Sequence, residues 1–576
     1  MGGEGAGTNR SPRATSAAYA IGIDFGTESG RVLLLDLQSG VEAGVAVVRY
    51  ASGAIDRVLP ETGEELPTDW ALQDPDDWRA VIETGIPQVL ATAGVAGRDV
   101  VGLGIDFTCC TVLPVAVDGT PLCSLEPWRT RPHAWPKLWK HHAAQSVADR
   151  LNEVARDRGE PFLARYGGKI SSEWYYPKLI ELWLEDREVY DAASGFIEAC
   201  DWIVWQLTGE ERRAMCSAGY KALWSPRDGL PQTEFFEAAY PGFDAPAEKL
   251  GTQFFPLGAR AGTLVPGLAE RLGLPASVAV AVGNVDSFVS VPGAGLLDPT
   301  SFLIVIGTSI CDVVVHPEEI LLPGITGVVK NGVLPGFYGY EAGQAAVGDM
   351  LAWFVELFGD AGAADRYAQL EREAAELRPG ANGVLALDWW NGNRTILADA
   401  DLSGVLCGMT LQTTAPEIYR ALLESIAFGN RRIVDNFEEH GLKLNQFVVC
   451  GGIAERSPLT MQLFADTSGR QVLVPGSTEI PARGAALFGA VAAGPEVGGF
   501  ADIMAAIDAL PPGIAATYEP NPEAVAVYEQ LYPLYRELHD TLGRQPADLL
   551  HELKRIRERS TQRSTQSSRA REKIPT

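Results

Sequence analysis

Two stretches of this chain, about 280 residues apart, repeat one pattern of apolar strand, Gly-Thr turn and second apolar strand. The first reads IGIDFGTESGRVLLLD from residue 21, and the second reads FLIVIGTSICDVVV from residue 302. A short pattern that opens each half of a long chain indicates two related domains. Because 576 residues suffice for several domains, we expect two such units with a cleft between them, lined by both turns.

Apolar runs alternate with stretches of helical periodicity along the whole chain, which is typical of α/β architecture. The expected strands are Ala20–Asp24, Arg31–Asp36, Val100–Phe107, Phe302–Ile306, Cys311–Val315 and Phe447–Cys450. The expected helices are Asp76–Leu90, Trp174–Asp186, Ala345–Phe358, Pro416–His440 and one that starts near Pro458.

Charge and cysteine usage exclude several classes of function. The chain has 47 Lys and Arg against 74 Asp and Glu, a net charge of −27. Such an acidic surface repels nucleic acid and anionic lipid, so neither is an expected partner. The eight cysteines include no C-x-x-C pair, which disfavours zinc ribbons and redox motifs and is typical of a reducing cytoplasm.

The two ends differ in composition from the rest of the chain. Residues 1–18 are rich in small residues and lack the apolar segment of a signal peptide, so we expect a disordered tail. Residues 551–576 hold eight Lys or Arg and three Glu, and we expect a basic, disordered tail over 548–576. The expected domains are therefore 19–297 and 298–547. Apolar helix faces are compatible with either a core or a homodimer interface.

The Gly-Thr turns are candidate phosphate sites. Glycine lets backbone N–H groups approach an oxyanion, and the Thr or Ser hydroxyl adds a donor. Asp24 precedes the first turn, where a carboxylate can hold Mg²⁺ directly or through water. Either turn alone is better explained as a structural hairpin, but the pair, with Asp24 beside one turn, favours the β- and γ-phosphates of a nucleotide.

Two further motifs add to this hypothesis. Gly451-Gly452-Ile453-Ala454 joins a buried strand to a helix, a turn that suits adenosine but also serves packing. Asp286 ends an apolar run in Gly283-Asn284-Val285-Asp286. There it could accept a proton from an alcohol that attacks a phosphoryl group, or it could cap the helix that follows. The chain has no Walker A sequence.

These motifs, in this order, resemble the FGGY family of carbohydrate kinases. The segment 403–424 is similar to the family's C-terminal signature, with one departure at Leu422. The N-terminal signature is altered, since Pro177-Lys178-Leu179 is followed by tryptophan only at Trp183. The resemblance spans residues 20–545 and implies two actin-like (ribonuclease H-like) ATPase domains of α/β class.

Six segments resemble the branch of the family that phosphorylates L-ribulose: DFTCC (106–110), GGKISSEW (167–174), CDWIVWQLTG (200–209), CSAGYKALW (216–224), GYEAGQ (339–344) and DWWNGNR (388–394). This implies ATP-dependent phosphorylation of the L-ribulose 5-hydroxyl, in L-arabinose catabolism. The roles implied residue by residue are general base for Asp286, sugar binding for Cys109, Lys221, Asp286 and Glu341, Mg²⁺ binding for Asp24, and ATP binding for Gly26, Thr27, Gly307, Thr308, Ser309, Gly451, Gly452 and Ser457.

Three alternatives remain open at this stage. A kinase of the same family could act on D-ribulose, ribitol or xylulose instead. An actin-like ATPase scaffold or chaperone would use the nucleotide site without sugar. A sugar sensor would bind its ligand without turnover.

Overall fold

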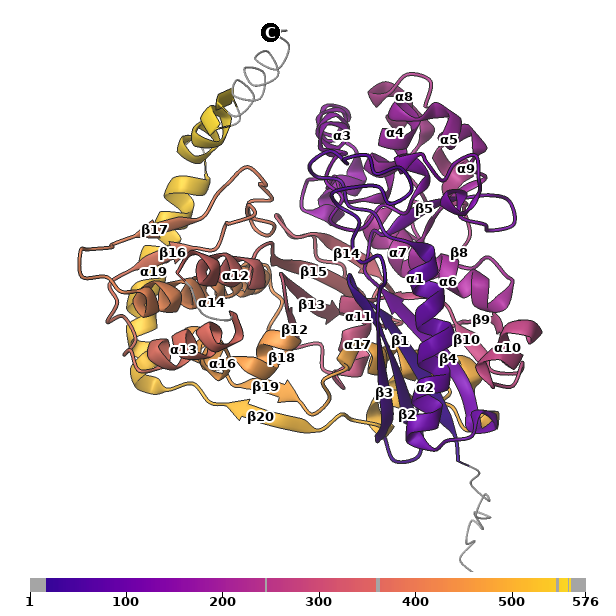
Figure 1. Cartoon of the computed structure of the whole chain (residues 1–576). Coiled ribbons are helices and arrows are strands. Elements are labelled where there is room, and N and C mark those ends of the chain that lie inside the picture. The colour runs from indigo at the N-terminus through magenta and orange to yellow at the C-terminus, as the bar shows by residue number, and fades with distance from the viewer. Residues whose placement is uncertain (1–16, 244–245, 359–362, 545–547, 558, 561–576) are drawn as a thin grey trace, which may run out of the picture.

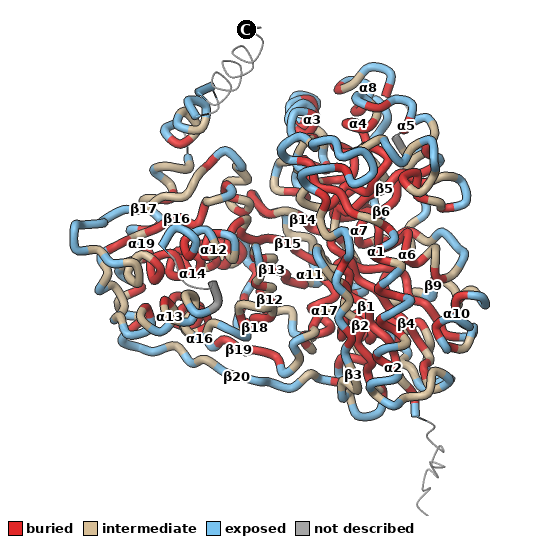
Figure 2. The backbone as a smooth tube through the Cα atoms, viewed as in Figure 1, coloured by how far each residue is buried: buried red, intermediate tan, exposed pale blue. Residues whose placement is uncertain are grey.

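The computed structural model describes residues 17–243, 246–358, 363–544, 548–557 and 559–560. Two seven-stranded sheets form the centres of two α/β units that lie side by side (Figure 1). The buried residues follow these sheets and the helix faces that pack on them (Figure 2). The α/β class expected from the sequence is confirmed.

The first sheet has the order β3-β2-β1-β4-β10-β9, with β11 paired to β4. β1 and β2 form the expected antiparallel hairpin, and β4 runs parallel to β1. Its strands are β1 (Tyr19–Phe25), β2 (Ser29–Asp36), β3 (Glu42–Arg49), β4 (Val100–Phe107), β9 (Arg260–Thr263), β10 (Ala279–Ala281) and β11 (Asn284–Val285).

The second sheet has the order β14-β15-β13-β12-β18-β19-β20. β12 and β13 form the second antiparallel hairpin, and β18 runs parallel to β12. Its strands are β12 (Ser301–Ile306), β13 (Ile310–His316), β14 (Gly327–Lys330), β15 (Tyr338–Gln344), β18 (Gln446–Cys450), β19 (Val472–Pro475) and β20 (Ile514–Tyr518). Shorter strands are β5 (Val112–Val115), β6 (Gly195–Glu198), β7 (Arg213–Ala214), β8 (Phe254–Phe255), β16 (Leu385–Leu387) and β17 (Val405–Cys407).

Helices cover both sheets. Those of the first half are α1 (Pro75–Ala80), α2 (Ile86–Ala93), α3 (Gln145–Arg158), α4 (Tyr175–Glu185), α5 (Arg187–Ala192), α6 (Ala199–Thr208), α7 (Met215–Lys221), α8 (Thr233–Ala239), α9 (Pro246–Leu250), α10 (Pro266–Leu272) and α11 (Asp286–Gly293). Those of the second half are α12 (Gly348–Leu357), α13 (Ala363–Ala375), α14 (Ala415–Glu439), α15 (Gly452–Arg456), α16 (Pro458–Ser468), α17 (Ile480–Ala493), α18 (Ile503–Ala509) and α19 (Pro522–Gly543). The helix expected over Asp76–Leu90 is α1 and α2 joined by a π-helical turn, Val81–Gly85.

Helix α17 of the second half packs on the sheet of the first half. A Cβ added to Gly22 of β1 would lie 1.7 Å from the Ala482 carbonyl oxygen, and one on Gly104 of β4 would lie 2.0 Å from that of Ala485. Helix α11 packs on α17 just as closely, since a Cβ on Gly484 would lie 1.9 Å from the Val289 carbonyl oxygen. Backbone touches backbone here, so the two halves share one core.

The ends of the chain differ in part from the expectation. Residues 1–16 and 561–576 lie outside the described residues. Residues 549–557, expected to be disordered, instead form a helix. Leu550 packs into the core of the second half, and His551 and Lys554 bind Asp399 and Asp401 at 2.9 and 2.6 Å. Charge pattern alone missed this helix because its apolar contacts are few. Across the described ranges, no helix combines the length and apolarity needed to cross a membrane.

Candidate active site between the two halves

Carboxylates gather where the central strands of the first sheet end. Asp24 of β1 stands directly opposite Asp106 of β4, and Asp106 in turn stands opposite Asn284 of β11. Parallel strands end at the same edge of a sheet, so these polar groups are neighbours. Asp286 follows β11 directly as the first residue of α11. The structure thus brings the candidate metal residue Asp24 and the candidate base Asp286 into one cluster.

Asp106 is a member of this cluster that the sequence analysis did not single out. Its side chain is fully buried, and neither carboxylate oxygen has a hydrogen-bond partner. Burial and the charges of Asp24 and Asp286 raise its pKa well above the usual range. A signal was present in the sequence: the tetrapeptide Gly-Ile-Asp-Phe occurs at 22–25 and again at 104–107.

The other two carboxylates are also perturbed. Burial raises the pKa of Asp24, against the opposing charge of Arg31, whose guanidinium lies 3.5 Å away. Burial and the charge of Asp24 raise the pKa of Asp286 to about 7. Asp286 Oδ1 accepts a hydrogen bond of 2.6 Å from the Ser287 N–H. A carboxylate with a pKa near neutrality is suited to general-base work at physiological pH.

An ion pair beside this cluster joins the two halves of the molecule. Lys221 Nζ, at the end of α7, donates to Glu341 Oε2 of β15 at 2.8 Å, and both side chains are buried. Although burial opposes it, the neighbouring Cys109 sulfur and the Glu341 carboxylate raise the pKa of Lys221 well above its usual range. Both Lys221 and Glu341 act on the pKa of Asp286. The predicted sugar residues therefore lie beside the predicted base.

Cys109 lies on the loop that follows β4. The thiol of the next residue, Cys110, is 3.7 Å from the Cys109 sulfur, and Cys110 has a φ of 63°. Lys178 Nζ donates to the Cys110 carbonyl oxygen at 2.7 Å and to that of Leu138 at 2.8 Å. The buried lysine of the altered N-terminal signature therefore fixes the main chain around Cys109.

The two Gly-Thr turns close in similar ways. In the first, Gly26 N–H donates to the Ser29 carbonyl oxygen at 3.0 Å, and Trp139 Nε1 donates to Thr27 Oγ1 at 3.0 Å. In the second, Gly307 N–H donates to the Ser309 carbonyl oxygen at 2.9 Å. A Cβ on Gly307 would meet nothing within 4 Å, so space lies open in front of this turn.

The Gly-Gly turn after β18 packs against the second Gly-Thr hairpin. Gly451 has a φ of 102°, and a Cβ there would lie 2.4 Å from the Ile306 carbonyl oxygen, so glycine is required. A Cβ on Gly452 would meet only the flexible end of the Arg456 side chain, at 2.6 Å. Ser457 caps α16 and donates to Glu371 Oε1 at 2.8 Å. Its hydroxyl therefore has a structural use, and its contact with adenine stays a prediction.

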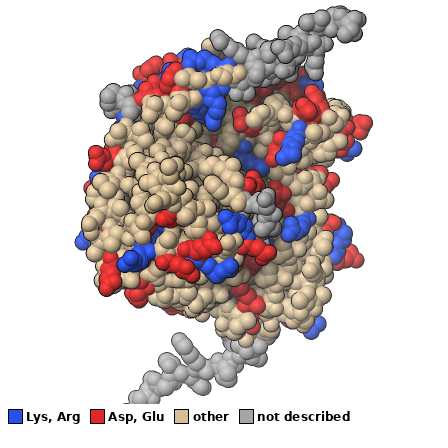
Figure 3. Space-filling view, turned by 60° about the vertical axis from the view of Figure 1, so that its left-hand side comes forward, with Lys and Arg blue, Asp and Glu red and all other residues tan. Residues whose placement is uncertain are grey.

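The residues at this boundary fit a magnesium nucleotide. The carboxylate oxygens of Asp106 are buried without partners beside Asp24, and oxygen ligands are those that Mg²⁺ prefers. The open space at Gly307 and the close backbone approach at Gly451 leave N–H groups free of side-chain obstruction. On the face shown in Figure 3, basic and acidic side chains are interspersed.

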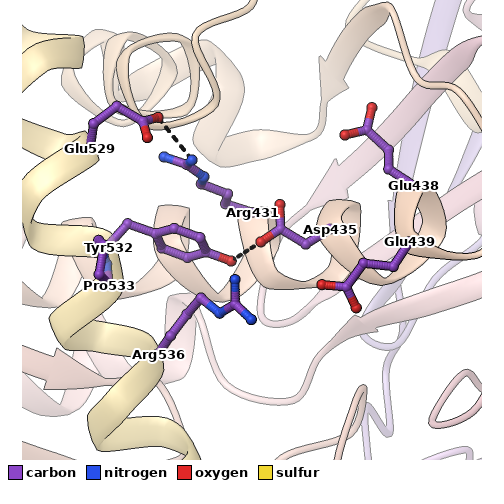
Figure 4. A pocket seen from close by; sticks show the side chains of 8 residues that line it. All are labelled: Arg431, Asp435, Glu438, Glu439, Glu529, Tyr532, Pro533 and Arg536. Carbon is purple, nitrogen blue, oxygen red and sulfur yellow. Dashed lines mark hydrogen bonds and ion pairs between the residues drawn. The ribbon is translucent and has the colours of Figure 1, made fainter.

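A groove of about 650 Å³ lies elsewhere, between α14 and α19 (Figure 4). Arg431 binds Glu529 at 2.8 Å, and the Tyr532 hydroxyl donates to Asp435 at 2.5 Å, so these charges are satisfied within the groove wall. None of the residues predicted to bind sugar or nucleotide lines this groove.

Comparison with known proteins shows which protein family the chain belongs to. Residues 19–293 match the N-terminal domain, and residues 302–493 the C-terminal domain, of the FGGY family of carbohydrate kinases. The chain belongs to this family. It is therefore a phosphotransferase whose substrates are a sugar and ATP.

Individual relatives agree with this assignment. A ribulokinase from Anoxybacillus flavithermus is 48% identical over 94% of this chain and 97% of its own length. A ribulokinase from Mycolicibacterium smegmatis is 42% identical over 96% of this chain and 98% of its own length. Among solved structures, a xylulose kinase from Rhodospirillum rubrum has a TM-score of 0.73 at 24% identity, covering 91% of this chain and 99% of its own. This structural similarity shows that the two chains share a fold.

Proposed function

We propose that the protein phosphorylates L-ribulose at its 5-hydroxyl with ATP, giving L-ribulose 5-phosphate, as a step of L-arabinose catabolism. The observation that carries this proposal is the meeting of Asp286, with a pKa of about 7, and the interdomain Lys221–Glu341 pair in one site. The name shared by relatives that are 42–48% identical over nearly the whole chain supports ribulose as the sugar.

Asp286 acts as the general base in this proposal. Its carboxylate takes the proton of the 5-hydroxyl as that oxygen attacks the γ-phosphorus, and the ADP oxygen leaves on the opposite side. The Ser287 N–H, 2.6 Å from Oδ1, fixes the orientation of the carboxylate. Positioning and charge neutralisation contribute most of the rate in phosphoryl transfer, so the fixed orientation matters.

Lys221, Glu341 and the main chain around Cys109 bind the sugar hydroxyls. Lys221 offers donors and Glu341 offers acceptors, so a neutral polyhydroxy substrate finds both kinds of partner. Because Lys221 lies on α7 and Glu341 on β15, the sugar contacts both halves at once. Binding therefore favours the arrangement in which the halves are together, which excludes water from the reacting groups.

The Thr308 N–H and the hydroxyls of Thr27 and Ser309 donate to the ATP phosphates, while Gly26 and Gly307, whose own N–H groups close the two turns, let the phosphates come close. Gly451, Gly452 and Ser457 lie on the adenosine side. Asp24 holds Mg²⁺, with Asp106 beside it. When bound, Mg²⁺ would neutralise the charge on the phosphates.

A sugar panel tests the proposal. ADP release is measured by a coupled assay with L-ribulose, D-ribulose, xylulose and ribitol, with and without Mg²⁺. We expect the highest kcat/KM with L-ribulose and Mg²⁺. A clear preference for another sugar would reassign the substrate within the family. ATP hydrolysis that ignores sugar would support a scaffold, and sugar binding without ADP release would support a sensor.

We further propose a cytoplasmic location, which suits the eight unpaired cysteines. A homodimer is the proposed assembly, and sedimentation of the full chain at micromolar concentration measures it. A monomer mass there would overturn it.

A further inference from the structure

Two adjacent cysteines lie on the loop that joins β4 to β5. Their sulfur atoms, Cys109 Sγ and Cys110 Sγ, are 3.7 Å apart, so the two thiols are in direct contact. Both are free cysteines, and Cys109 is partly exposed whereas Cys110 is buried. The mechanism above uses the main chain around Cys109 and leaves both thiols without a role.

The loop is held on both sides of the pair. The Thr108 N–H donates to the last carbonyl oxygen of β1 at 3.2 Å, and the Thr111 carbonyl oxygen accepts from the first N–H of α6 at 2.7 Å. Between these anchors, Lys178 Nζ donates to the Cys110 carbonyl oxygen at 2.7 Å. A fixed main chain therefore keeps the two thiols together.

The strand pairing places this loop at the edge of the sheet where the candidate base lies. β4 ends at Phe107, which stands opposite Val285 of β11 in a parallel pair. Asp286 follows Val285 directly, and Cys109 is two residues beyond Phe107. Both segments leave adjacent strands at the same edge. Because the main chain around Cys109 is a proposed sugar contact, a change in the shape of this loop changes the sugar site.

A bond between the two sulfurs does not fit the loop in its present shape. A disulfide holds its sulfurs at about 2.05 Å and its α-carbons usually at about 4.4–6.8 Å. Adjacent residues hold their α-carbons only about 3.8 Å apart. The main chain of both residues must therefore rotate when the bond forms, which turns the Cys110 carbonyl oxygen away from Lys178 Nζ. Lys178 is fully buried, so water cannot replace the lost acceptor.

The same distortion makes the bond easy to reopen. Strained disulfides have more oxidising potentials than structural ones and are the labile, regulatory kind. In a reducing compartment, the resting state of the pair is therefore the dithiol, with the loop in its sugar-binding shape.

We propose that Cys109 and Cys110 form a redox-modification site, at which a small disulfide compound oxidises the pair to a disulfide between adjacent residues and thereby reversibly blocks sugar binding. The inference rests on the proposed function, since it takes the main chain around Cys109 to contact the sugar.

The chemical step is a thiol–disulfide exchange in two stages. The exposed Cys109 sulfur attacks one sulfur of the small disulfide, whose S–S bond breaks and releases one thiol. The Cys110 sulfur then attacks the Cys109 sulfur, and the second thiol leaves as the bond between the cysteines forms. The cysteines give up two electrons and two protons, which the small disulfide takes up as it becomes two thiols.

The test treats the reduced full chain with the disulfide of 2-mercaptoethanol and follows peptide mass and kinetics together. We expect the peptide that contains both cysteines to lose two hydrogen atoms. We expect kcat/KM for L-ribulose to fall by about 10- to 100-fold, the size of a lost hydrogen bond to a charged group. Dithiothreitol should reverse both changes. L-Ribulose at about ten times its Kd should slow the modification about tenfold, because only the sugar-free protein reacts.

Calorimetry separates a local change from a general loss of structure. The oxidised chain should no longer bind L-ribulose, whereas its binding of ADP should persist, because the adenosine side of the proposed site lies on the second half. Thermal melting of the oxidised chain checks the fold.

Three variants identify the reacting thiols. Cys109→Ala lacks the exposed thiol, so it should keep after treatment the activity that it had before. Cys110→Ala lacks the second thiol, so Cys109 should gain the mass of the reagent as a mixed disulfide. Cys407→Ala is the matched control, because it removes an exposed cysteine of β17. Its loss of activity on treatment should equal that of wild type.

The outcomes separate this inference from the proposed function. If wild type does not phosphorylate L-ribulose, the proposed function fails, and the same treatment is followed with the sugar that is turned over. If wild type is active but the peptide keeps its mass, or loses two hydrogen atoms while sugar binding persists, the inference alone is overturned. Equal loss of activity in treated Cys109→Ala and treated wild type would also overturn it.

Discussion

The two sheets of this molecule share a topology and differ in chemistry. Five strands follow the same order in each, β3-β2-β1-β4-β10 and β15-β13-β12-β18-β19. Where Asp24 precedes the first Gly-Thr turn, Val305 precedes the second. Asp24 stands opposite Asp106, whereas Val305 stands opposite Cys450. The backbone of the Gly-Thr hairpin is repeated, but the paired carboxylates that we propose for acid–base and metal chemistry belong to the first hairpin and its neighbouring strand.

The largest expected effect comes from Asp286, the carboxylate of the first half that we propose as the base. Asp286→Asn should lower kcat by about 10³- to 10⁴-fold, the upper range for a lost general base. Sugar binding, measured by calorimetry, should persist, because the amide keeps the shape and the hydrogen bond from Ser287. Asp298→Asn, an exposed change in the linker to the second half, should leave kcat as in wild type. Near-normal turnover in Asp286→Asn would contradict the base assignment.

Substitutions in the Lys221–Glu341 ion pair, which joins the two halves, should have the next largest effect. Lys221→Met and Glu341→Gln should each raise KM for the sugar by about 10- to 100-fold, since each leaves a buried charged partner unpaired. KM for ATP should change little. The changes are measured by steady-state kinetics with each substrate varied in turn. An unchanged sugar KM in both variants would remove the pair from the sugar site.

The dependence of kcat/KM on pH tests how the charges around Asp286 act on its pKa. Asp286 must be ionised to accept a proton, so kcat/KM should fall as pH drops through about 7, the pKa to which burial and Asp24 raise it. Glu341→Gln removes a negative charge that raises this pKa, so the acid limb should move to lower pH. Lys221→Met removes a positive charge that lowers it, so the limb should move to higher pH. Opposite shifts would rule out Asp286 as the titrating group.

Asp106→Asn should change the free energy of unfolding, and the size of this change should depend on pH. The native pKa of Asp106 is raised, so the native state binds more protons than the unfolded state above the ordinary pKa of aspartate. Stability from this group is therefore lost as pH rises. The neutral amide should stabilise the fold at pH 8 by about 1–3 kcal/mol, and by much less at pH 3. Urea unfolding at both pH values measures this. An equal change in the free energy of unfolding at both pH values would mean that the pKa of Asp106 is the same in the folded and the unfolded protein.

The smallest expected effect lies at the C-terminal helix. Removal of residues 551–576 deletes the ion pairs of His551 with Asp399 and Lys554 with Asp401 but keeps the buried Leu550. Partly exposed ion pairs contribute about 0–1 kcal/mol each. Kinetic constants should stay within twofold of wild type. A larger loss would show that this helix supports the loop that contains Asp399 and Asp401.

The sequence analysis predicted both hairpins, both central parallel strands and the helices α4, α12, α14 and α16, because each has strong local periodicity. It named Asp24, Asp286, Lys221 and Glu341, which the structure brings together. It missed Asp106, whose importance depends on the carboxylate of Asp24 that lies opposite it on the adjacent strand. Such pairings join residues far apart in the chain, and no local pattern encodes them.

The backbone contact of α17 with the first sheet has a consequence for synthesis. The strands that contain Gly22 and Gly104 leave the ribosome long before Ala482 and Ala485 do. At about 5–20 residues per second, the helix that covers that face follows β11 only after roughly 10–40 s. During this interval, one face of the nascent first sheet lacks its own covering helix. Until α17 emerges, this face of the nascent first half is therefore open to non-native contacts.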